Sequence, residues 1–256
     1  MARYQITISD EQLHGLLQGD RGLADLLEAV LNQVSQALPL IRTSVSRPFG
    51  EVRRLASLGP ITVMRHVGNE PFHDSGSPLG FYLLSFWQWA NSDLVSNATR
   101  GILAEYLVAQ ALGVAADSVR DEWAAYDLET PDGTRIEVKS AAYIQSWQQP
   151  RLSRISFRVS KTLAWDRYSN RYGGESKRHA DVYVFALLAH EEHPTLNPLD
   201  VSQWEFFVLP TIVLDTRERS QHSITLPSLR RLAEPVSFHE LPRAVAEAGK
   251  VQRRAD

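Results

Sequence analysis

The sequence predicts an α/β fold with a mixed central sheet flanked by helices. Three observations lead to this fold class. An apolar stripe with helical spacing covers residues 97–112, the turn sequence Pro131-Asp132-Gly133 separates two β-prone runs, and continuous apolar runs cover residues 181–189 and 203–209. A helical period indicates an amphipathic helix, whereas short continuous apolar runs are typical of buried strands. We therefore expect one α/β domain over residues 78–248.

The helix over residues 97–112 carries one acid where an apolar neighbour is expected. Ala104, Leu107 and Val108 belong to its stripe, Gly113 follows its last turn, and Glu105 lies at the margin of the stripe. A carboxylate near an apolar face requires a partner. Glu105 is therefore either a third acid of a site formed with the following segment or one half of a salt bridge with a nearby arginine.

The hairpin after this helix brings two acids together. Pro, Asp and Gly suit a tight turn closed by a left-handed glycine. If Thr130 pairs with Thr134, Asp127 lies opposite Glu137, and opposed β-carbons are about 5 Å apart, so that both carboxylates can bind one divalent cation. Side chains alternate along a strand, so Glu137 and Lys139 share one face.

This arrangement, an aspartate, nine intervening residues and then Glu137-Val138-Lys139, resembles the PD-(D/E)xK nuclease superfamily, which includes restriction endonucleases. The resemblance implies an αβββαβ core. It also implies that Asp127, Glu137 and the Val138 carbonyl hold Mg²⁺, with Mn²⁺ as a substitute, while Lys139 orients and deprotonates the attacking water. Glu105 would assist as an additional acid and metal ligand.

Two further positions bear on this resemblance. Tyr126 stands where the family often has a proline, and Gln145 resembles a glutamine that several nuclease families place after their lysine. A simple role at the sheet edge is the alternative for Gln145.

A second Glu-x-Lys sequence serves as an internal control. Glu175-Ser176-Lys177 follows two glycines in a polar stretch that lacks an opposing acid, and we expect a solvated loop there. For the hairpin itself, the alternative is an amphipathic pair of strands with a solvated charged face.

A basic segment follows the hairpin. Residues 151–180 contain eight Lys or Arg and two acidic residues, a net charge of +6 in a chain of net charge −3. Basic side chains neutralise phosphates, and the interleaved aromatic residues Phe157, Trp165, Tyr168 and Tyr172 could stack on bases. We expect DNA contacts from Gln145, Arg151, Arg154, Arg158, Lys161, Arg167 and Arg171. The alternative is an exposed loop with ordinary solvated charges.

Composition narrows the chemistry. The 256-residue chain has no cysteine, so any metal must be held by oxygen or imidazole ligands, and oxygen ligands favour Mg²⁺ or Mn²⁺. Neither an apolar signal segment nor a membrane-length apolar run is present, so we expect a cytoplasmic location. The expected partners are DNA and a second copy of the chain, in a homodimer.

The remaining regions carry weaker signals. Residues 19–34 resemble the amino-terminal helices of Mutator-type insertion-sequence transposases, a likeness that covers residues 1–37 and implies a helical extension. Residues 38–77 are expected to be linker or irregular structure, and residues 249–256 a frayed polar tail. The aromatic cluster at residues 81–89 is expected to form a core helix, with a base-stacking platform as the alternative.

The function expected from the hairpin is hydrolysis of DNA phosphodiester bonds by a Mg²⁺-dependent deoxyribonuclease. Restriction, junction or repair processing, and RNA cleavage are the alternatives for its role. The alternative from another class is a non-catalytic DNA-binding protein, either a decayed nuclease or a transposase-derived module.

Overall fold

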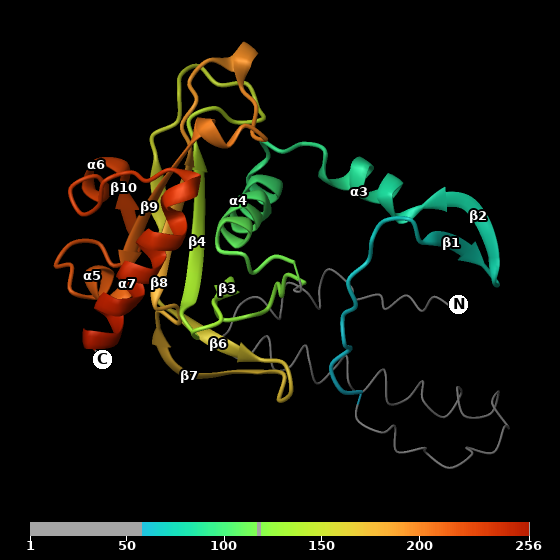
Figure 1. Ribbon diagram of the computed structural model, residues 1–256, viewed down its shortest axis with the longest axis horizontal. Helices are drawn as coiled ribbons and strands as arrows, with labels where there is room; N and C mark the ends of the chain where they lie inside the picture. The colour runs from blue at the N-terminus through green and yellow to red at the C-terminus, as the bar shows by residue number, and fades with distance from the viewer. Residues whose placement is uncertain (1–57, 117–118, 256) are drawn as a thin grey trace, which may run out of the picture. The chain divides into compact units, whose positions relative to one another are not determined.

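The computed structural model describes residues 58–116 and 119–255. The chain divides into two compact units, Met1–Leu58 and Gly59–Asp256, and the fold below is that of the second unit. The transposase resemblance over residues 1–37 lies outside the described residues, and the domain limits at residues 37, 77 and 248 stay predictions. Figure 1 shows the arrangement of the helices and strands.

The central sheet has four strands in the order β3, β4, β8, β9. Strand β3 (Leu128–Glu129) runs antiparallel to β4 (Arg135–Ala142), β4 runs parallel to β8 (Val182–Leu188), and β8 runs antiparallel to β9 (Trp204–Pro210). The mixed sheet confirms the predicted fold class, and the two apolar runs form the predicted strands β8 and β9.

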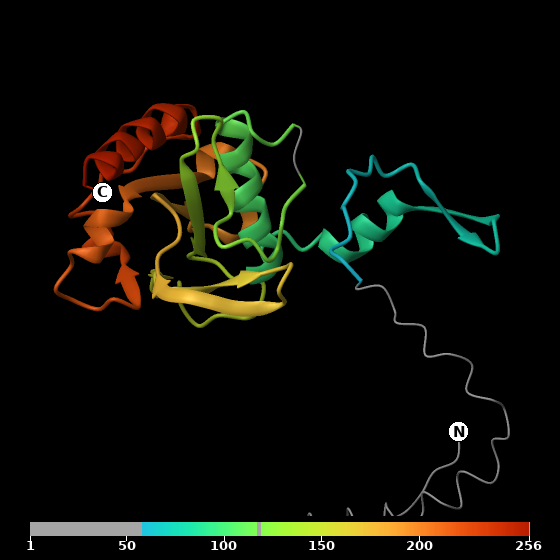
Figure 2. The same cartoon turned by 90° about the horizontal axis from the view of Figure 1, so that it is seen from below.

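Both faces of the sheet are covered. Helices α4 (Asn97–Ala111) and α7 (Leu241–Ala255) pack on one face. The other face is covered by the β5–β10 pair (Ser156–Arg158 with Ser223–Thr225) and by two short helices, α5 (Thr211–Asp215) and α6 (Leu226–Leu229). Figure 2 shows these elements on opposite sides of the strands.

Strand β8 forms the centre of both cores because its side chains alternate. Val182, Val184 and Ala186 pack toward α4 and α7, whereas Tyr183 and Phe185 pack toward β5 and α6. All seven residues of the strand are buried. A sheet covered on both faces requires such a continuous apolar strand.

The connection from β4 to β8 is made of strands. It contains β5 and a hairpin of β6 (Thr162–Asp166) and β7 (Arg171–Lys177). An αβββαβ core would have a helix in its crossover between parallel strands, and here β5, β6 and β7 take that place. Three short 3₁₀ helices, η1 (His193–Thr195), η2 (Val201–Gln203) and η3 (Phe238–Glu240), lie between the later elements.

The prediction of linker or irregular structure over residues 38–77 is wrong for its last part. Strands β1 (Pro71–Asp74) and β2 (Ser77–Tyr82) form a hairpin, in which Asp74 pairs with Ser77. Ser75 and Gly76 form its turn with φ of 49° and 87°. Two consecutive residues with positive φ are typical of the type I′ turn that closes two-residue hairpins.

The core helix predicted from the aromatic cluster is also wrong. Helix α3 (Leu83–Asn91) contains no buried residue. Phe81, Tyr82, Phe86 and Trp89 are exposed, and Trp87 is partly buried. Aromatic residues with helical spacing predicted the helix correctly, but the pattern does not determine what the helix packs against.

The chain end is helical where a frayed tail was predicted. Helix α7 continues to Ala255 and buries Val245, Ala248, Gly249 and Gln252. The Gln252 side-chain oxygen accepts a hydrogen bond of 2.8 Å from the Ile212 amide. Polar residues on the outer face of the helix conceal the buried stripe in the sequence. None of the described helices combines the length and apolar character needed to cross a membrane.

Candidate active site

The β3–β4 hairpin has the predicted turn and register. Gly133 has φ of +81°, its amide donates to the Thr130 carbonyl at 2.8 Å, and the Thr130 amide donates to the Thr134 carbonyl at 3.0 Å. Leu128 pairs with Ile136, and the Asp127 amide donates to the Ile136 carbonyl at 2.9 Å. The same register therefore places Asp127 opposite Glu137, as predicted from the turn.

The two faces of β4 differ as expected from alternation. Ile136 and Val138 are buried in the core formed with α4 and α7. Glu137 and Lys139 lie on the opposite face and line a cavity of about 70 Å³ with Arg158, His179 and Tyr183. The polar face of the hairpin is thus enclosed by the segment that connects β4 to β8.

Asp127 is the most perturbed acid of this region. Its Oδ2 accepts a hydrogen bond of 2.7 Å from the Val138 amide. Burial, together with the nearby charges of Glu137 and Glu105, raises the pKa of Asp127 to about 7, against the opposing effects of the Val138 hydrogen bond and the charge of Lys139. Three acids and one lysine therefore influence each other electrostatically at the hairpin.

The charges of Glu137 and Lys139 neutralise each other directly. The Lys139 Nζ forms an ion pair with Glu137 Oε1, with 31% of the lysine and 19% of the glutamate side chain exposed. Both groups are open enough to reach a ligand. Tyr183 lies beside them, and burial together with the Glu137 charge raises the pKa of its hydroxyl.

Glu105 comes from α4, the helix before the hairpin. At its start the Ser96 hydroxyl accepts a hydrogen bond from the Thr99 amide, and Gly113, with φ of 72°, follows its last residues as predicted. Glu105 forms an ion pair with Arg120, with distances of 2.5 and 3.2 Å to the two carboxylate oxygens. The salt-bridge alternative is thus present, and Glu105 also acts electrostatically on Asp127.

Within residues 58–116 and 119–255, no three His, Asp or Glu side chains converge so as to hold a metal ion. Glu137 is engaged with Lys139, and Glu105 is engaged with Arg120. Of the three acids, Asp127 has a backbone amide as its partner. The three acids expected as metal ligands therefore lie in one region, and two of them, Glu137 and Glu105, form ion pairs with basic side chains.

Gln145 lies beyond the end of β4 and is buried. Its Nε2 donates to the Ala142 carbonyl at 2.8 Å and to the Ser153 hydroxyl at 3.1 Å. Its Oε1 accepts a hydrogen bond of 3.3 Å from Arg100. Gln145 thus organises the loop after the strand and lines a cavity of about 430 Å³ that also reaches Lys139.

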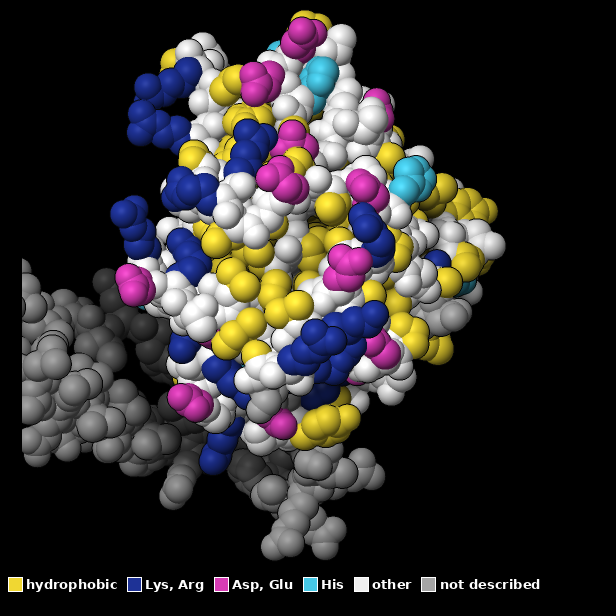
Figure 3. Space-filling view, turned by 60° about the vertical axis from the view of Figure 1, so that its left-hand side comes forward, with side chains coloured by type: hydrophobic (Ala, Val, Ile, Leu, Met, Phe, Trp, Pro, Cys, Tyr) yellow, Lys and Arg dark blue, Asp and Glu magenta, His cyan; other side chains and the backbone are white. Residues whose placement is uncertain are grey.

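The six predicted basic DNA contacts are all exposed, and they differ in their surroundings. Arg154 and Arg158 line the cavity next to Lys139. Arg167 forms an ion pair of 2.6 Å with Asp121. Arg151, Lys161 and Arg171 are exposed in the segment between β4 and β8. In Figure 3, Lys and Arg side chains gather at several places around an apolar patch, with acidic side chains between them.

Two residues counted in the basic, aromatic segment belong to the interior. Arg178 is buried, forms an ion pair with Asp215 and donates to the Val159 carbonyl at 2.9 Å. Phe157 is buried and contacts Phe185 edge to face at 5.1 Å between ring centroids. A stacking role is therefore wrong for Phe157, whereas Tyr168 and Tyr172 are exposed.

The control sequence Glu175-Ser176-Lys177 lies in strand β7, not in a loop. All seven residues of this strand are exposed, so the predicted solvation of Glu175 and Lys177 is confirmed. Gly174, with φ of +80°, and the polar composition concealed the strand.

Sequence reasoning missed two arginines of this region. Arg120 holds Glu105, and Arg100 occupies the first turn of α4 with its side chain buried. The signal for Arg100 was its spacing, because it precedes Ala104 by four residues and Leu107 by seven on the apolar stripe. A cation on such a stripe requires an explanation as much as an acid does.

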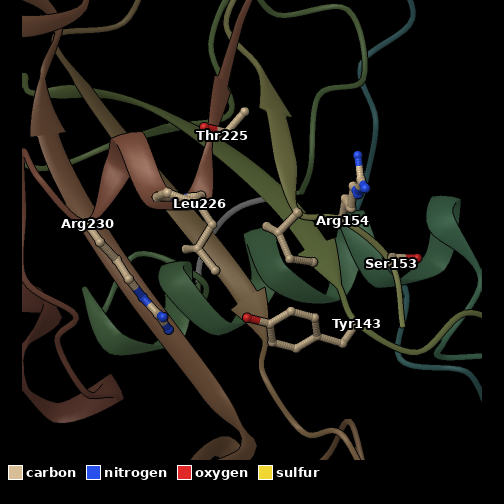
Figure 4. A pocket seen from close by; sticks show the side chains of 8 residues that line it. Tyr143, Ser153, Arg154, Thr225, Leu226 and Arg230 are labelled. Atoms are coloured by element: carbon tan, nitrogen blue, oxygen red, sulfur yellow. The ribbon is translucent and has the colours of Figure 1, made fainter. Parts of the chain in front are cut away.

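A further cavity of about 570 Å³ lies next to the Gln145 cavity and shares Ser153, Arg154 and Ile155 with it. In Figure 4, Leu226 and the Tyr143 ring point toward one another across it, and Arg230 extends along one side. Arg230 is paired with Glu205 at 2.9 Å. The lining of this 570 Å³ cavity is mainly apolar.

Comparison with known proteins places this region in a family. No curated protein shows significant sequence similarity to the chain. The family model described as bacteriophage T4 endonuclease IV matches residues 80–226, which include α4, the β3–β4 hairpin, β8 and β9 and form a nuclease-type domain. Because this match covers more than half of the 256 residues, the chain belongs to the bacteriophage T4 endonuclease IV family.

Proposed function

We propose that the protein is a metal-dependent endonuclease that hydrolyses phosphodiester bonds of DNA at the β3–β4 hairpin. The observation that carries the proposal is the register of this hairpin, which sets Asp127 opposite Glu137 with Lys139 on the same face. The family match to an endonuclease covers the hairpin and supports the same reaction class. The resemblance to the PD-(D/E)xK nucleases at the hairpin remains part of this proposal, whereas the αβββαβ order does not, because β5, β6 and β7 connect β4 to β8.

The oxygen donors at the hairpin are of the kind that a divalent cation takes, and they would have to converge on it, because no three described acidic or histidine side chains do so in the structure. Asp127 and Glu137, with the Val138 carbonyl, would hold Mg²⁺ or Mn²⁺, which prefer oxygen ligands. Glu105 would assist directly or through water. The proposal is supported by the electrostatic effect of Glu137 and Glu105 on Asp127. A cation bound near Asp127 would relieve the repulsion between these three acids. Binding would require Glu137 to turn from Lys139.

A bound divalent cation supplies Lewis-acid stabilisation of the charge that develops on the scissile phosphate. Lys139 Nζ, once released from Glu137, donates to the attacking water or to a phosphate oxygen and holds that group in position. A compact ammonium suits this role because it can lose a proton, whereas a guanidinium stays charged. Arg120 holds the Glu105 carboxylate in an ion pair.

The test of the proposal is a cleavage assay on supercoiled and linear DNA. Wild-type protein is compared with Asp127→Asn, in Mg²⁺ and in excess EDTA. We expect cleavage by the wild type in Mg²⁺ alone and none by the variant. Cleavage that persists in EDTA or in the variant would contradict the site, and cleavage confined to an RNA substrate would contradict DNA as the target.

The same assay addresses the biological role and the alternative function. Discrete fragments from linear DNA would indicate a restriction-type specificity for a sequence, and a continuous distribution of sizes would argue against it. A protein that binds DNA but does not cleave it in Mg²⁺ or Mn²⁺ would support the non-catalytic alternative. Sedimentation of the purified protein tests the homodimer, which stays a prediction from the sequence.

A further inference from the structure

Arg100 is a buried cation whose partners are all neutral. Only 4% of the residue is exposed. Its guanidinium donates to the Val95 carbonyl at 2.7 Å, to Asn97 Oδ1 at 2.7 Å, to Ser140 Oγ at 3.2 Å and to Gln145 Oε1 at 3.3 Å. In the part of the chain that the structure describes, no carboxylate forms an ion pair with it.

Such a charge is energetically unfavourable where it lies. A buried ion without a counter-ion loses its hydration, and the pKa of Arg100 is lowered by this burial. Arg100 also occupies the first turn of α4, where the helix dipole is positive and disfavours a second positive charge. Its four neutral partners fix the guanidinium in one orientation without compensating its charge.

The cavity beside Arg100 has a single sign of charge. The residues that line its 430 Å³ include four cations, Arg100, Lys139, Arg154 and Arg158, and no acidic side chain of the described chain lines it. Of these four cations Lys139 is paired with Glu137, whereas no carboxylate of the described residues forms an ion pair with Arg100, Arg154 or Arg158. This cavity is therefore a place where an anion would gain from several cations at once.

The cavity is continuous with the acidic site. Lys139 and Arg158 line both the small cavity at Glu137 and the larger cavity at Arg100. A group bound in the larger cavity would therefore lie next to a lysine and an arginine that also line the cavity at Glu137. Trp147, which is exposed, lies in the lining of the larger cavity.

From these observations we infer that the cavity at Arg100 and Gln145 is a phosphate subsite, which binds a backbone phosphate of the nucleic acid next to the one that is cleaved. The choice of a nucleic acid rests on the proposed function, whereas the preference for a phosphate-like oxyanion rests on the cavity. A phosphate oxygen would supply the counter-ion that Arg100 lacks, and Gln145 would hold the arginine in place.

The decisive variant supplies that counter-ion from within the protein. Gln145→Glu sets a carboxylate at the position where Arg100 already donates, and it removes the Nε2 hydrogen bond to the Ala142 carbonyl. The matched control is Gln148→Glu, the same change at an exposed residue of the same loop. Two measurements are made, the rise in Tm on adding inorganic phosphate at constant ionic strength and the affinity for a labelled oligonucleotide in EDTA.

We expect phosphate to raise the Tm of the wild type and of Gln148→Glu. Gln145→Glu should show no rise in Tm with phosphate, whatever its Tm without phosphate, and should bind the oligonucleotide at least about tenfold more weakly than the control, as the loss of a charged hydrogen bond predicts. Equal phosphate responses and equal affinities of the two variants would overturn the inference.

Two further variants separate the possible failures. Arg158→Gln removes an exposed cation of the cavity and should reduce the phosphate response even if Gln145→Glu does not fold, and an unchanged response would count against the subsite. Asp127→Asn should keep the phosphate response while losing cleavage. If Asp127→Asn cleaves normally while the phosphate response follows the expected pattern, the proposed function fails and the anion site stands.

Discussion

The chain contains two Glu-x-Lys sequences in strands, and their surroundings differ in every respect that matters for chemistry. Glu137-Val138-Lys139 lies in β4, between β3 and the buried strand β8, opposite Asp127. Glu175-Ser176-Lys177 lies in β7, which pairs with β6 in a two-stranded sheet and is exposed along its whole length.

The comparison shows that the chemical properties of a Glu-x-Lys pair depend on the residues that lie opposite it and on its burial. At β4, partial burial and the opposing acid perturb Asp127 and bring Lys139 onto Glu137. At β7, water solvates both charges and weakens their interaction with any other group. The two sequences therefore form a matched pair, in which each substitution at β4 has an equivalent control at β7.

The largest effect is expected at the glutamates. Glu137→Gln removes a proposed ligand and should reduce DNA cleavage in Mg²⁺ by roughly 1,000-fold, because metal and electrostatic stabilisation supply most of the rate. Glu175→Gln should leave the rate within about twofold, as expected for a solvated charge. Cleavage rates of both variants at saturating Mg²⁺ measure the contrast, and equal losses would remove the distinction between the two motifs.

The next effect concerns stability and pH. Asp127 has a folded pKa of about 7 against an ordinary value of 3.8, so the folded protein retains a proton that the unfolded chain has lost. The stability that this proton contributes is complete below about pH 4 and is lost as the pH rises through 7.

Asp127→Asn should therefore be more stable than the wild type by up to about 4 kcal/mol at pH 8 and equally stable at pH 4. Urea unfolding in EDTA at both pH values measures the difference, and Glu175→Gln serves as the control with no such pH dependence. A variant that is less stable than the wild type at pH 8 would show that the Asp127 carboxylate is favourably ionised.

Substitution of the two lysines should have effects on the DNA cleavage rate that differ by about 100-fold. Lys139→Met removes a donor that contributes to proton transfer or to the position of the water, and such groups contribute about 100-fold or more. Lys177→Met is its control. If both variants cleave at the wild-type rate while Glu137→Gln does not, the hairpin binds metal without using its lysine.

The smallest effect is expected at Glu105. Glu105→Gln breaks the ion pair with Arg120 and removes the acid whose charge acts less strongly on Asp127 than that of Glu137, so cleavage should fall about tenfold, the range typical of groups that support a metal site. Arg120→Gln breaks the same ion pair but keeps the acid. An equal loss of cleavage in both variants would show that the salt bridge, and not the Glu105 carboxylate as a metal ligand, is responsible.

Much of the fold followed from periodicity and turn chemistry. The helix at residues 97–112, the Pro131-Asp132-Gly133 turn and the strands β8 and β9 were predictable because each element has a local pattern. The hairpin at Ser75-Gly76 was missed although Gly in a short turn is a known signal. The length of α7 was missed because its buried face includes Gly249 and Gln252, which are not apolar in sequence.

The site was predictable as far as it lies on one hairpin. The register of Asp127 and Glu137 follows from the turn between them, a contact across ten residues. Arg100, Arg120 and the buried state of Arg178 depend on contacts between distant segments, as in the Arg100 hydrogen bond to Gln145. No local pattern specifies such contacts, because burial of a charge is decided by the partners that the tertiary fold brings to it.

The central claim, that the carboxylates of the β3–β4 hairpin hold a divalent metal, is tested most directly by Mn²⁺ binding. Titration calorimetry at pH 8 compares the wild type, Glu137→Gln and Glu175→Gln. We predict that the wild type and Glu175→Gln share one Mn²⁺-binding site. In Glu137→Gln this site should be lost or its affinity for Mn²⁺ weakened at least about 100-fold. Equal Mn²⁺ binding by all three proteins would contradict it.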